Sequence, residues 1–398
     1  MIIHQVMLKM QLGQMLQILR ANQEPDSYYS HFQNFMAYFF SFLLTIISFN
    51  AAAHHPKNLT VKSCPCDAAC YTGEISNLKC DDRQAQFDST GMPHKSHVMM
   101  KGIKNSNQQF PLKQPYNAAN HNQVRINLNP VMAAVPIMTD SGAIGIAVNG
   151  VPIFDPSKQD ERHDVNGKPA HTLDVGELDE CGGHAGRGDD YHYHIAPKCL
   201  IEQLGKDKIE NQKLPIGYAK DGFSIHALGW FDSANNIENY LDKCRGAFDA
   251  SGKYFYNVKS QRKWDVLNCY SGEPKELGIR GSILRRDKNG SALAGGDGAK
   301  GMIPIKFAVE NYYSKTYGNN LCYFSDGELS GENLLLKSGA VIRNYSAHGT
   351  IFYCNSKCYS HFFESDKRRE GGRVTVNEVI TSGCPEGLDV KKLNLFRE

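Results

Sequence analysis

Short apolar runs that alternate with polar or glycine positions recur through the middle of the chain. Two of them, over residues 143–154 and 216–225, surround the turn pairs Asn149-Gly150 and Asp221-Gly222. Such pairs favour tight β-hairpin turns, whose central residues adopt positive φ. The pattern therefore predicts two hairpins in a chain that is mainly β.

A longer unit is repeated around these hairpins. Six positions match at a constant offset of 63 residues: Leu178, Asp179, Cys181, Gly183, Tyr191 and Tyr193 correspond to Leu241, Asp242, Cys244, Gly246, Tyr254 and Tyr256. A lobe of about 70 residues buries little core alone, so we expect duplicated β-rich lobes with a pseudo-two-fold relation. Each lobe would be braced by a disulfide, Cys181–Cys199 and Cys244–Cys269, with cross-lobe pairing as the alternative.

The residue pattern of the N-terminal region predicts a targeting signal. Residues 36–53 are an apolar run that ends in small residues, which is typical of a signal peptide cleaved after Ala53. A retained membrane anchor is the alternative. Residues 1–35 are then interpreted as a non-native extension, because we expect translation to begin at Met36. Sequons at Asn58, Asn289 and Asn344 agree with secretion.

Composition narrows the class of protein. The net charge of +2 and the apolar fraction of 41% favour neither disorder nor nucleic-acid binding. Twelve cysteines suit a disulfide framework in an extracellular protein. Four of them open the mature chain in a Cys-rich segment, 54–84, where two disulfides are favoured over a thiolate metal site: Cys64, Cys66, Cys70 and Cys80.

The remaining chain divides by composition. Residues 85–275 hold the repeat, the glycine-rich residues 276–300 predict a linker, and residues 301–398 predict a small C-terminal β domain with two disulfides. Strands are expected there over 303–309, 334–342 and 373–380. His348 and His361 are isolated and are interpreted as structural or solvated.

Candidate chemistry concentrates in Tyr191-His192-Tyr193-His194. Residues two apart share a face of a strand, so His192 and His194 face together, and His184 lies on a glycine-rich turn upstream. Three imidazoles are a plausible ligand set for a zinc or copper ion. The alternative is a half-buried strand with a tyrosine face and a solvated histidine face.

The repeat favours the metal interpretation. The second copy keeps the tyrosines but has Ala247, Phe255 and Asn257 where the first has its histidines. All three histidines are absent together from the second copy, as expected for residues that act as a unit. We therefore expect the tyrosines to face the core and the histidines to form a site. His94 and His97, on a proline-fixed turn, could supply a further ligand. Asp189 and Asp190 could orient an imidazole or act as a base.

These motifs resemble the YHYH-domain family of largely secreted proteins. The resemblance covers roughly residues 85–275 and rests on the run after Asn149, Cys181-Gly-Gly-His184, Tyr191–His194, 216–219 and 221–223. It implies an extracellular β-rich domain but no particular reaction. The chain departs from the family pattern at Ser224 and His226, where proline and tyrosine are common, and at residues 254–257.

Three functions follow from the sequence. The leading hypothesis is a secreted metal-binding protein with zinc or copper at His184, His192 and His194. The second is a metal-dependent hydrolase, with Asp189 or Asp190 as base, or a copper oxidoreductase. The third is a non-catalytic adhesion or matrix module. The expected partners are the metal ion and extracellular proteins, without nucleic acid, and a membrane only if the signal segment is retained.

Overall fold

The computed structural model describes residues 58–393, apart from 105–110, 141, 158–169, 186–188, 261–262, 280, 285–305, 336–340 and 368–371. The predicted extension, the signal peptide and the sequon at Asn289 lie outside these residues. The chain separates into two units, 1–54 and 55–398, and the described residues all belong to the second. No helix in the described part is long and apolar enough to cross a membrane.

The N-terminal segment forms a small antiparallel sheet in the order β1-β2-β3. Its strands are β1 (Ile75–Cys80), β2 (Gln84–Ser89) and β3 (Val124–Asn127). Strand β2 buries every second residue, as a strand with one core-facing side should. Cys64–Cys70 and Cys66–Cys80 brace this end, which confirms two disulfides among these four cysteines.

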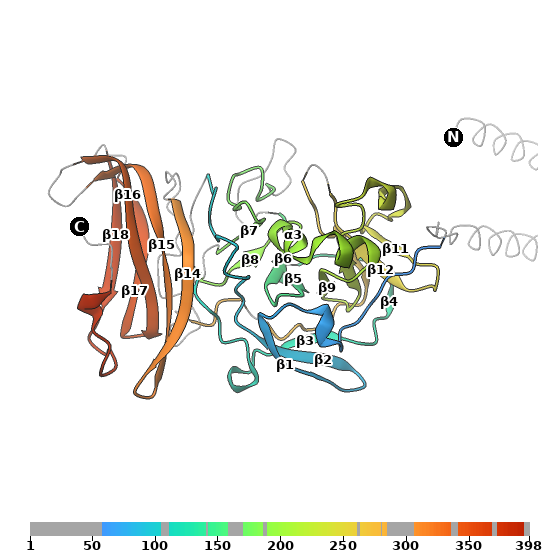
Figure 1. The fold of residues 1–398 in the computed structure, drawn as a ribbon, viewed down its shortest axis with the longest axis horizontal. Coiled ribbons are helices and arrows are strands. Elements are labelled where there is room, and N and C mark those ends of the chain that lie inside the picture. Colours follow the sequence, from blue (N-terminus) through green and yellow to red (C-terminus); the bar gives the residue numbers. More distant parts are fainter. Residues whose placement is uncertain are drawn as a thin grey trace, which may run out of the picture. The chain divides into compact units, whose positions relative to one another are not determined.

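The described part of the central sheet has eight strands in the order β11-β12-β10-β9-β5-β6-β8-β7. The predicted hairpins form its middle: β5 (Ala143–Ala147) with β6 (Pro152–Phe154), and β9 (Gly217–Ala219) with β10 (Ser224–His226). Gly150 and Gly222 adopt positive φ at the two turns. Outward lie β8 (His192–Tyr193), β7 (Gly183–His184), β12 (Tyr254–Asn257) and β11 (Gly246–Phe248) (Figure 1).

The two halves of this sheet repeat the same contacts. β5 and β9 pair antiparallel at the centre. Each half then continues through one parallel pair, β6–β8 or β10–β12. The Tyr191 hydroxyl donates to Asp179 at 2.7 Å, and the Tyr254 hydroxyl donates to Asp242 at 2.6 Å. These contacts recur at equivalent positions of the sequence repeat, and the duplicated lobes with their pseudo-two-fold relation stay a prediction.

An α-helix and a further strand pair also belong to the central region. Helix α3 (Lys198–Lys206) follows Pro197, a residue suited to a helix start because it lacks the N–H that would go unpaired there. Cys199 on this helix bonds to Cys181, and Cys244 bonds to Cys269, which confirms both predicted pairs. Strand β4 (Met132–Met138) pairs with β13 (Cys269–Gly272).

The C-terminal region is an antiparallel sheet in the order β14-β15-β16-β17-β18. Its strands are β14 (Lys306–Tyr317), β15 (Asn320–Leu335), β16 (Val341–Asn355), β17 (Cys358–Lys367) and β18 (Gly372–Ile380). Two disulfides occur as predicted, Cys322–Cys354 and Cys358–Cys384. The single strand predicted over 334–342 is wrong, because β15 ends and β16 begins within it.

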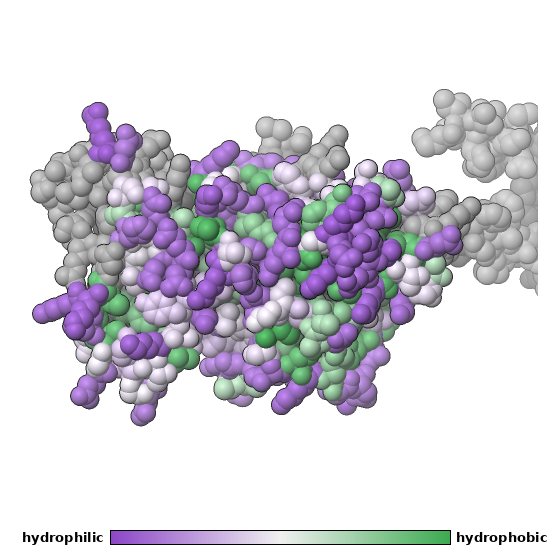
Figure 2. Space-filling view, in the orientation of Figure 1, coloured by the Kyte–Doolittle hydropathy of each residue, from purple (hydrophilic) through white to green (hydrophobic). Residues whose placement is uncertain are grey.

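The core continues from the central region into this sheet. Phe307, Val309 and Tyr312 belong to the same cluster of buried side chains as Met99, and Val309 N–H donates to the Met99 carbonyl at 3.0 Å. In the predicted linker, Leu277, Ile279 and Leu284 are also buried. The mainly β, disulfide-braced architecture is thus confirmed, whereas the domain boundaries stay predictions. Figure 2 shows one face of the molecule, where hydrophilic side chains predominate.

Candidate metal centre

Strands β7 and β8 place the three histidines of the YHYH region. They pair antiparallel, with Gly183 opposite Tyr193 and His184 opposite His192. Alternation along the chain then carries His194 to the same side as His192. Strand β8 lies between β6 and β7, so both of its edges are paired. All three histidines are buried, so the alternative of a solvated histidine face is wrong.

The tyrosines pack on the other side as predicted. Tyr191 and Tyr193 have no exposed surface, and their ring centroids lie 5.6 Å apart. The Tyr193 hydroxyl accepts a hydrogen bond from the Asn149 amide at 3.0 Å. A side chain at Gly183 would lie 2.6 Å from the Tyr191 ring, so this position requires glycine. The tyrosine face thus anchors the strand that carries the histidines.

Asp179 fixes the turn before His184. Its carboxylate accepts hydrogen bonds from the Cys181 and Gly183 N–H groups, from Met100 N–H and from the Tyr191 hydroxyl. Burial raises the pKa of Asp179 to about 6, although these hydrogen bonds favour its charged form. Asp242 makes the same turn contacts with Cys244 and Gly246 in the second lobe. The turn is therefore scaffold and not itself the site.

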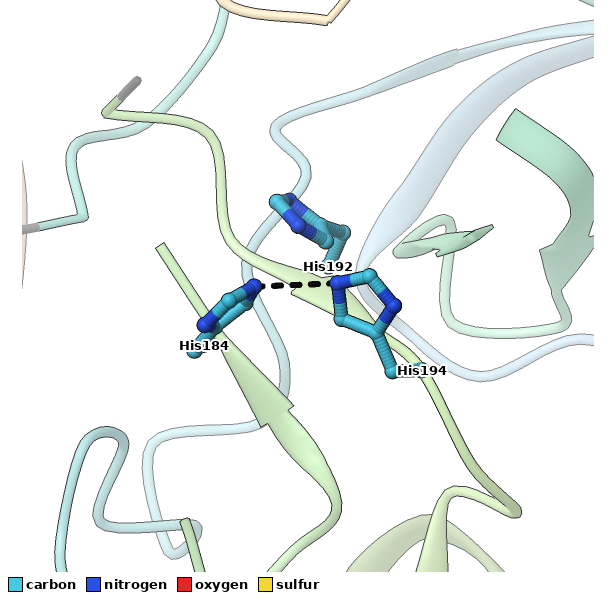
Figure 3. Close-up of side chains that lie close together, drawn as sticks. All are labelled: His184, His192 and His194. Atoms are coloured by element: carbon cyan, nitrogen blue, oxygen red, sulfur yellow. Dashed lines mark hydrogen bonds between the residues drawn. The ribbon is translucent and has the colours of Figure 1, made fainter. Parts of the chain in front are cut away.

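The three imidazoles converge on one point (Figure 3). One ligand atom from each of His184, His192 and His194 can be chosen so that all lie within 4.8 Å of one another. His184 Nε2 and His194 Nε2 are 2.9 Å apart. Among the described residues, these three form the one group of three or more potential ligands that meets in this way.

Hydrogen bonds determine which nitrogen of two of the histidines can bind an ion. His192 Nδ1 lies 2.9 Å from the Asp190 carbonyl, and His194 Nδ1 contacts the Asp155 carbonyl. A carbonyl only accepts, so both Nδ1 atoms carry the proton, and the neutral rings present a lone pair at Nε2. This is the orientation that a ligating imidazole needs.

The same reasoning identifies the donor and the acceptor in the contact between His184 and His194. Since His194 Nε2 is an acceptor in its neutral form, the 2.9 Å contact makes His184 Nε2 the donor. An ion bound at His184 Nε2 would replace that proton. Two nitrogens bound at about 2.0 Å to a tetrahedral ion lie about 3.3 Å apart. An ion would therefore fit between His184 and His194 if their Nε2 atoms moved apart by a few tenths of an ångström.

Two further side chains border the cluster. Phe154 stacks on His192 with 4.0 Å between the ring centroids. The Asp190 carboxylate lies 3.5 Å from His192 Nδ1, and both residues are buried. A buried anion next to neutral imidazoles offsets part of the charge of a bound cation. The arrangement is compatible with metal binding.

The other predicted site residues lie elsewhere. The Asp189 carboxylate accepts hydrogen bonds from the Gln114 amide at 3.0 Å and from the Ser282 hydroxyl, so it joins distant segments. His94 and His97 lie beside each other, with ring centroids 6.2 Å apart, and do not belong to the converging group. The structure thus brings together three of the predicted ligands with Asp190.

Sequence reasoning missed Phe154 and the Asp155 carbonyl. Both follow the first hairpin, and they reach the histidines because β6 pairs in parallel with β8, Ile153 opposite Tyr193. Local alternation carries no signal of a parallel pairing between strands this far apart. The repeat offered one clue, since each hairpin precedes its Tyr-x-Tyr strand.

Comparison with known proteins agrees with the motif. Residues 123–271 match the family model described as YHYH protein. No curated protein and no solved structure matches the chain. The matched range contains both hairpins and all three converging histidines. Residues 123–271 therefore form a YHYH domain.

Proposed function

We propose that this chain is a secreted protein that binds one zinc or copper ion through His184, His192 and His194. The observation that supports this most is the convergence of three buried imidazoles, two of which already use Nδ1 on backbone carbonyls. An ion held by the three imidazoles would replace the hydrogen bond between His184 Nε2 and His194 Nε2.

The donor set limits the choice of ion. All twelve cysteines form disulfides, so no thiolate is available as a ligand. Imidazole suits both zinc and copper, and the pattern of three protein ligands leaves a fourth position for water or a small molecule. The chain's own contribution would be to hold the imidazoles through the Asp155 and Asp190 carbonyls and to supply the Asp190 carboxylate nearby.

The second lobe supports a single site. Phe255 has no exposed surface and packs in an apolar cluster with Ala247. The Asn257 amide is engaged with the backbone of Leu228, accepting from its N–H at 2.8 Å and donating to its carbonyl at 3.1 Å. The equivalent positions are thus filled by apolar and amide groups that suit neither ion.

An extracellular location fits the proposal. Six disulfides brace the described chain, and such bonds persist in oxidising compartments. The YHYH match is consistent with the same location.

A metal titration tests the proposal. Chelator-stripped protein would be titrated with zinc and, separately, with copper(II), and binding followed by calorimetry. The wild type should bind one ion, His194→Ala should lose most of the affinity, and the matched control Asn257→Ala should bind as the wild type does. Equal losses from both variants, or no binding by the wild type, would contradict a site in the first lobe.

A further inference from the structure

The three imidazoles of the candidate centre are nearly equally spaced. The ring centroids of His184 and His192 are 4.8 Å apart, those of His184 and His194 are 4.7 Å apart, and those of His192 and His194 are 5.0 Å apart. The rings thus form a nearly equilateral triangle (Figure 3). No ring lies opposite another across the point on which all three converge.

This spacing distinguishes the two ions that the proposed function leaves open. Zinc is usually tetrahedral, whereas copper(II) prefers a square plane, in which any three ligands include one opposed pair. Imidazoles on a tetrahedral ion have ring centroids about 5.2 Å apart, and an opposed pair has centroids about 6.4 Å apart. The observed separations of 4.7 to 5.0 Å lie near the tetrahedral value and far from the opposed one.

Contacts around the rings resist the movement that copper(II) requires. Opposing two of the rings would separate their centroids by more than about 1 Å beyond the present distance. His192 is held by the Asp190 carbonyl at Nδ1 and by the stacked Phe154 ring. Phe154 also packs edge-on against His194, whose Nδ1 contacts the Asp155 carbonyl. A tetrahedral ion leaves these contacts in place.

We propose that the centre is a zinc site, in which the packing of the three imidazoles disfavours the opposed geometry of copper(II). This inference rests on the proposed function, because it names the ion for the same three ligands. Copper(II) binds most nitrogen sites more tightly than zinc does. The selection of zinc therefore lies in the geometry, and it reduces the usual advantage of copper(II).

Cobalt(II) reports the geometry of a zinc site, because tetrahedral cobalt(II) absorbs visible light far more strongly than six-coordinate cobalt(II). Chelator-stripped wild type would be titrated with cobalt(II) and then with zinc. The expected result is an intense visible spectrum at one cobalt per chain, which zinc removes by displacing the cobalt. The weak spectrum of bound six-coordinate cobalt would overturn the zinc assignment and leave the metal site standing. Failure to bind any of the three ions would contradict the proposed function itself.

A substitution of Phe154 tests whether packing sets the preference. Phe154→Ala removes the ring stacked on His192, so that imidazole could move toward an opposed position. The ratio of the zinc and copper(II) dissociation constants should shift about tenfold in favour of copper(II). The matched control is Phe248→Ala, which removes a half-buried ring from the second lobe and should leave the ratio unchanged.

An unchanged ratio in a folded Phe154→Ala variant, or an equal shift in both variants, would overturn the role of packing. Thermal unfolding shows whether each variant is folded. The cobalt spectrum needs only the wild type, so it decides the geometry of the bound ion even if Phe154→Ala does not fold.

Discussion

His226 gives the chain a predicted sensitivity to acid. Its imidazole has no exposed surface, lies 2.9 Å through Nε2 from the Ser224 hydroxyl and packs edge-on against Phe255. Burial lowers the pKa of His226 from 6.5 to about 3. The unfolded chain therefore binds a proton at this residue under conditions in which the folded chain does not.

The magnitude follows from the shift in pKa. Above pH 6.5, His226 is neutral in both the folded and the unfolded chain, so its burial causes no pH-dependent loss of stability. As the pH falls from 6.5 toward 3, only the unfolded chain binds a proton at His226, so the free energy of unfolding falls. At 1.36 kcal/mol for each pH unit, the loss amounts to about 3 kcal/mol by pH 4.5. His226→Phe removes this titration, so the difference in free energy of unfolding between the variant and the wild type should move by about 3 kcal/mol in favour of the variant.

Urea unfolding at pH 7.5 and pH 4.5, with chelator present, measures that difference. A constant packing cost of the larger phenylalanine cancels, because only the change between the two pH values is used. His121→Gln, at an exposed position, controls for the removal of a histidine as such. A difference between His226→Phe and the wild type that is the same at both pH values would refute the reasoning.

Three further predictions concern the scaffold and the site. Tyr191→Phe removes a hydroxyl that donates to the Asp179 carboxylate, and Tyr254→Phe removes one that donates to the Asp242 carboxylate. Each substitution should lower the free energy of unfolding by about 1.5–3 kcal/mol. Urea unfolding measures this loss, and an unchanged free energy would show that these bonds contribute little. Asp190→Asn should weaken metal binding about 10- to 100-fold. Asp189→Asn should change metal binding little, because the Asp189 carboxylate bonds to Gln114 and Ser282. Comparable losses of affinity for both variants in competition titrations would contradict this distinction. Metal binding should weaken below about pH 6, since the ligands are neutral imidazoles, and retention of the ion at pH 4 would argue against histidine ligation.

Local features of the fold could be predicted from the sequence. The turn pairs at Asn149 and Asp221 determine hairpins through the conformations that their glycines allow. The cysteines at the glycine turn and beyond the far end of the strand in each copy indicated Cys181–Cys199 and Cys244–Cys269. The repeat also distinguished the tyrosine face from the histidine face. These signals are local in the chain, or are comparisons between equivalent positions.

Features that depend on pairings between distant segments could not be predicted. The parallel β6–β8 contact, which brings Phe154 and the Asp155 carbonyl to the histidines, has no local pattern. Burial of His192 was equally hidden, because an alternating strand has the same pattern whether or not its second face is covered. The exposed apolar strand β4 would pass in the sequence for an ordinary core strand.

The metal content of the purified protein tests the central claim most directly. Protein secreted by expressing cells would be purified without chelator and analysed for elements, beside a His192→Ala/His194→Ala variant. The account predicts about one zinc or copper ion per chain in the wild type, because the three converging imidazoles form a single site, and essentially none in the variant. A wild type without a stoichiometric metal, or a variant that retains it, would contradict the account.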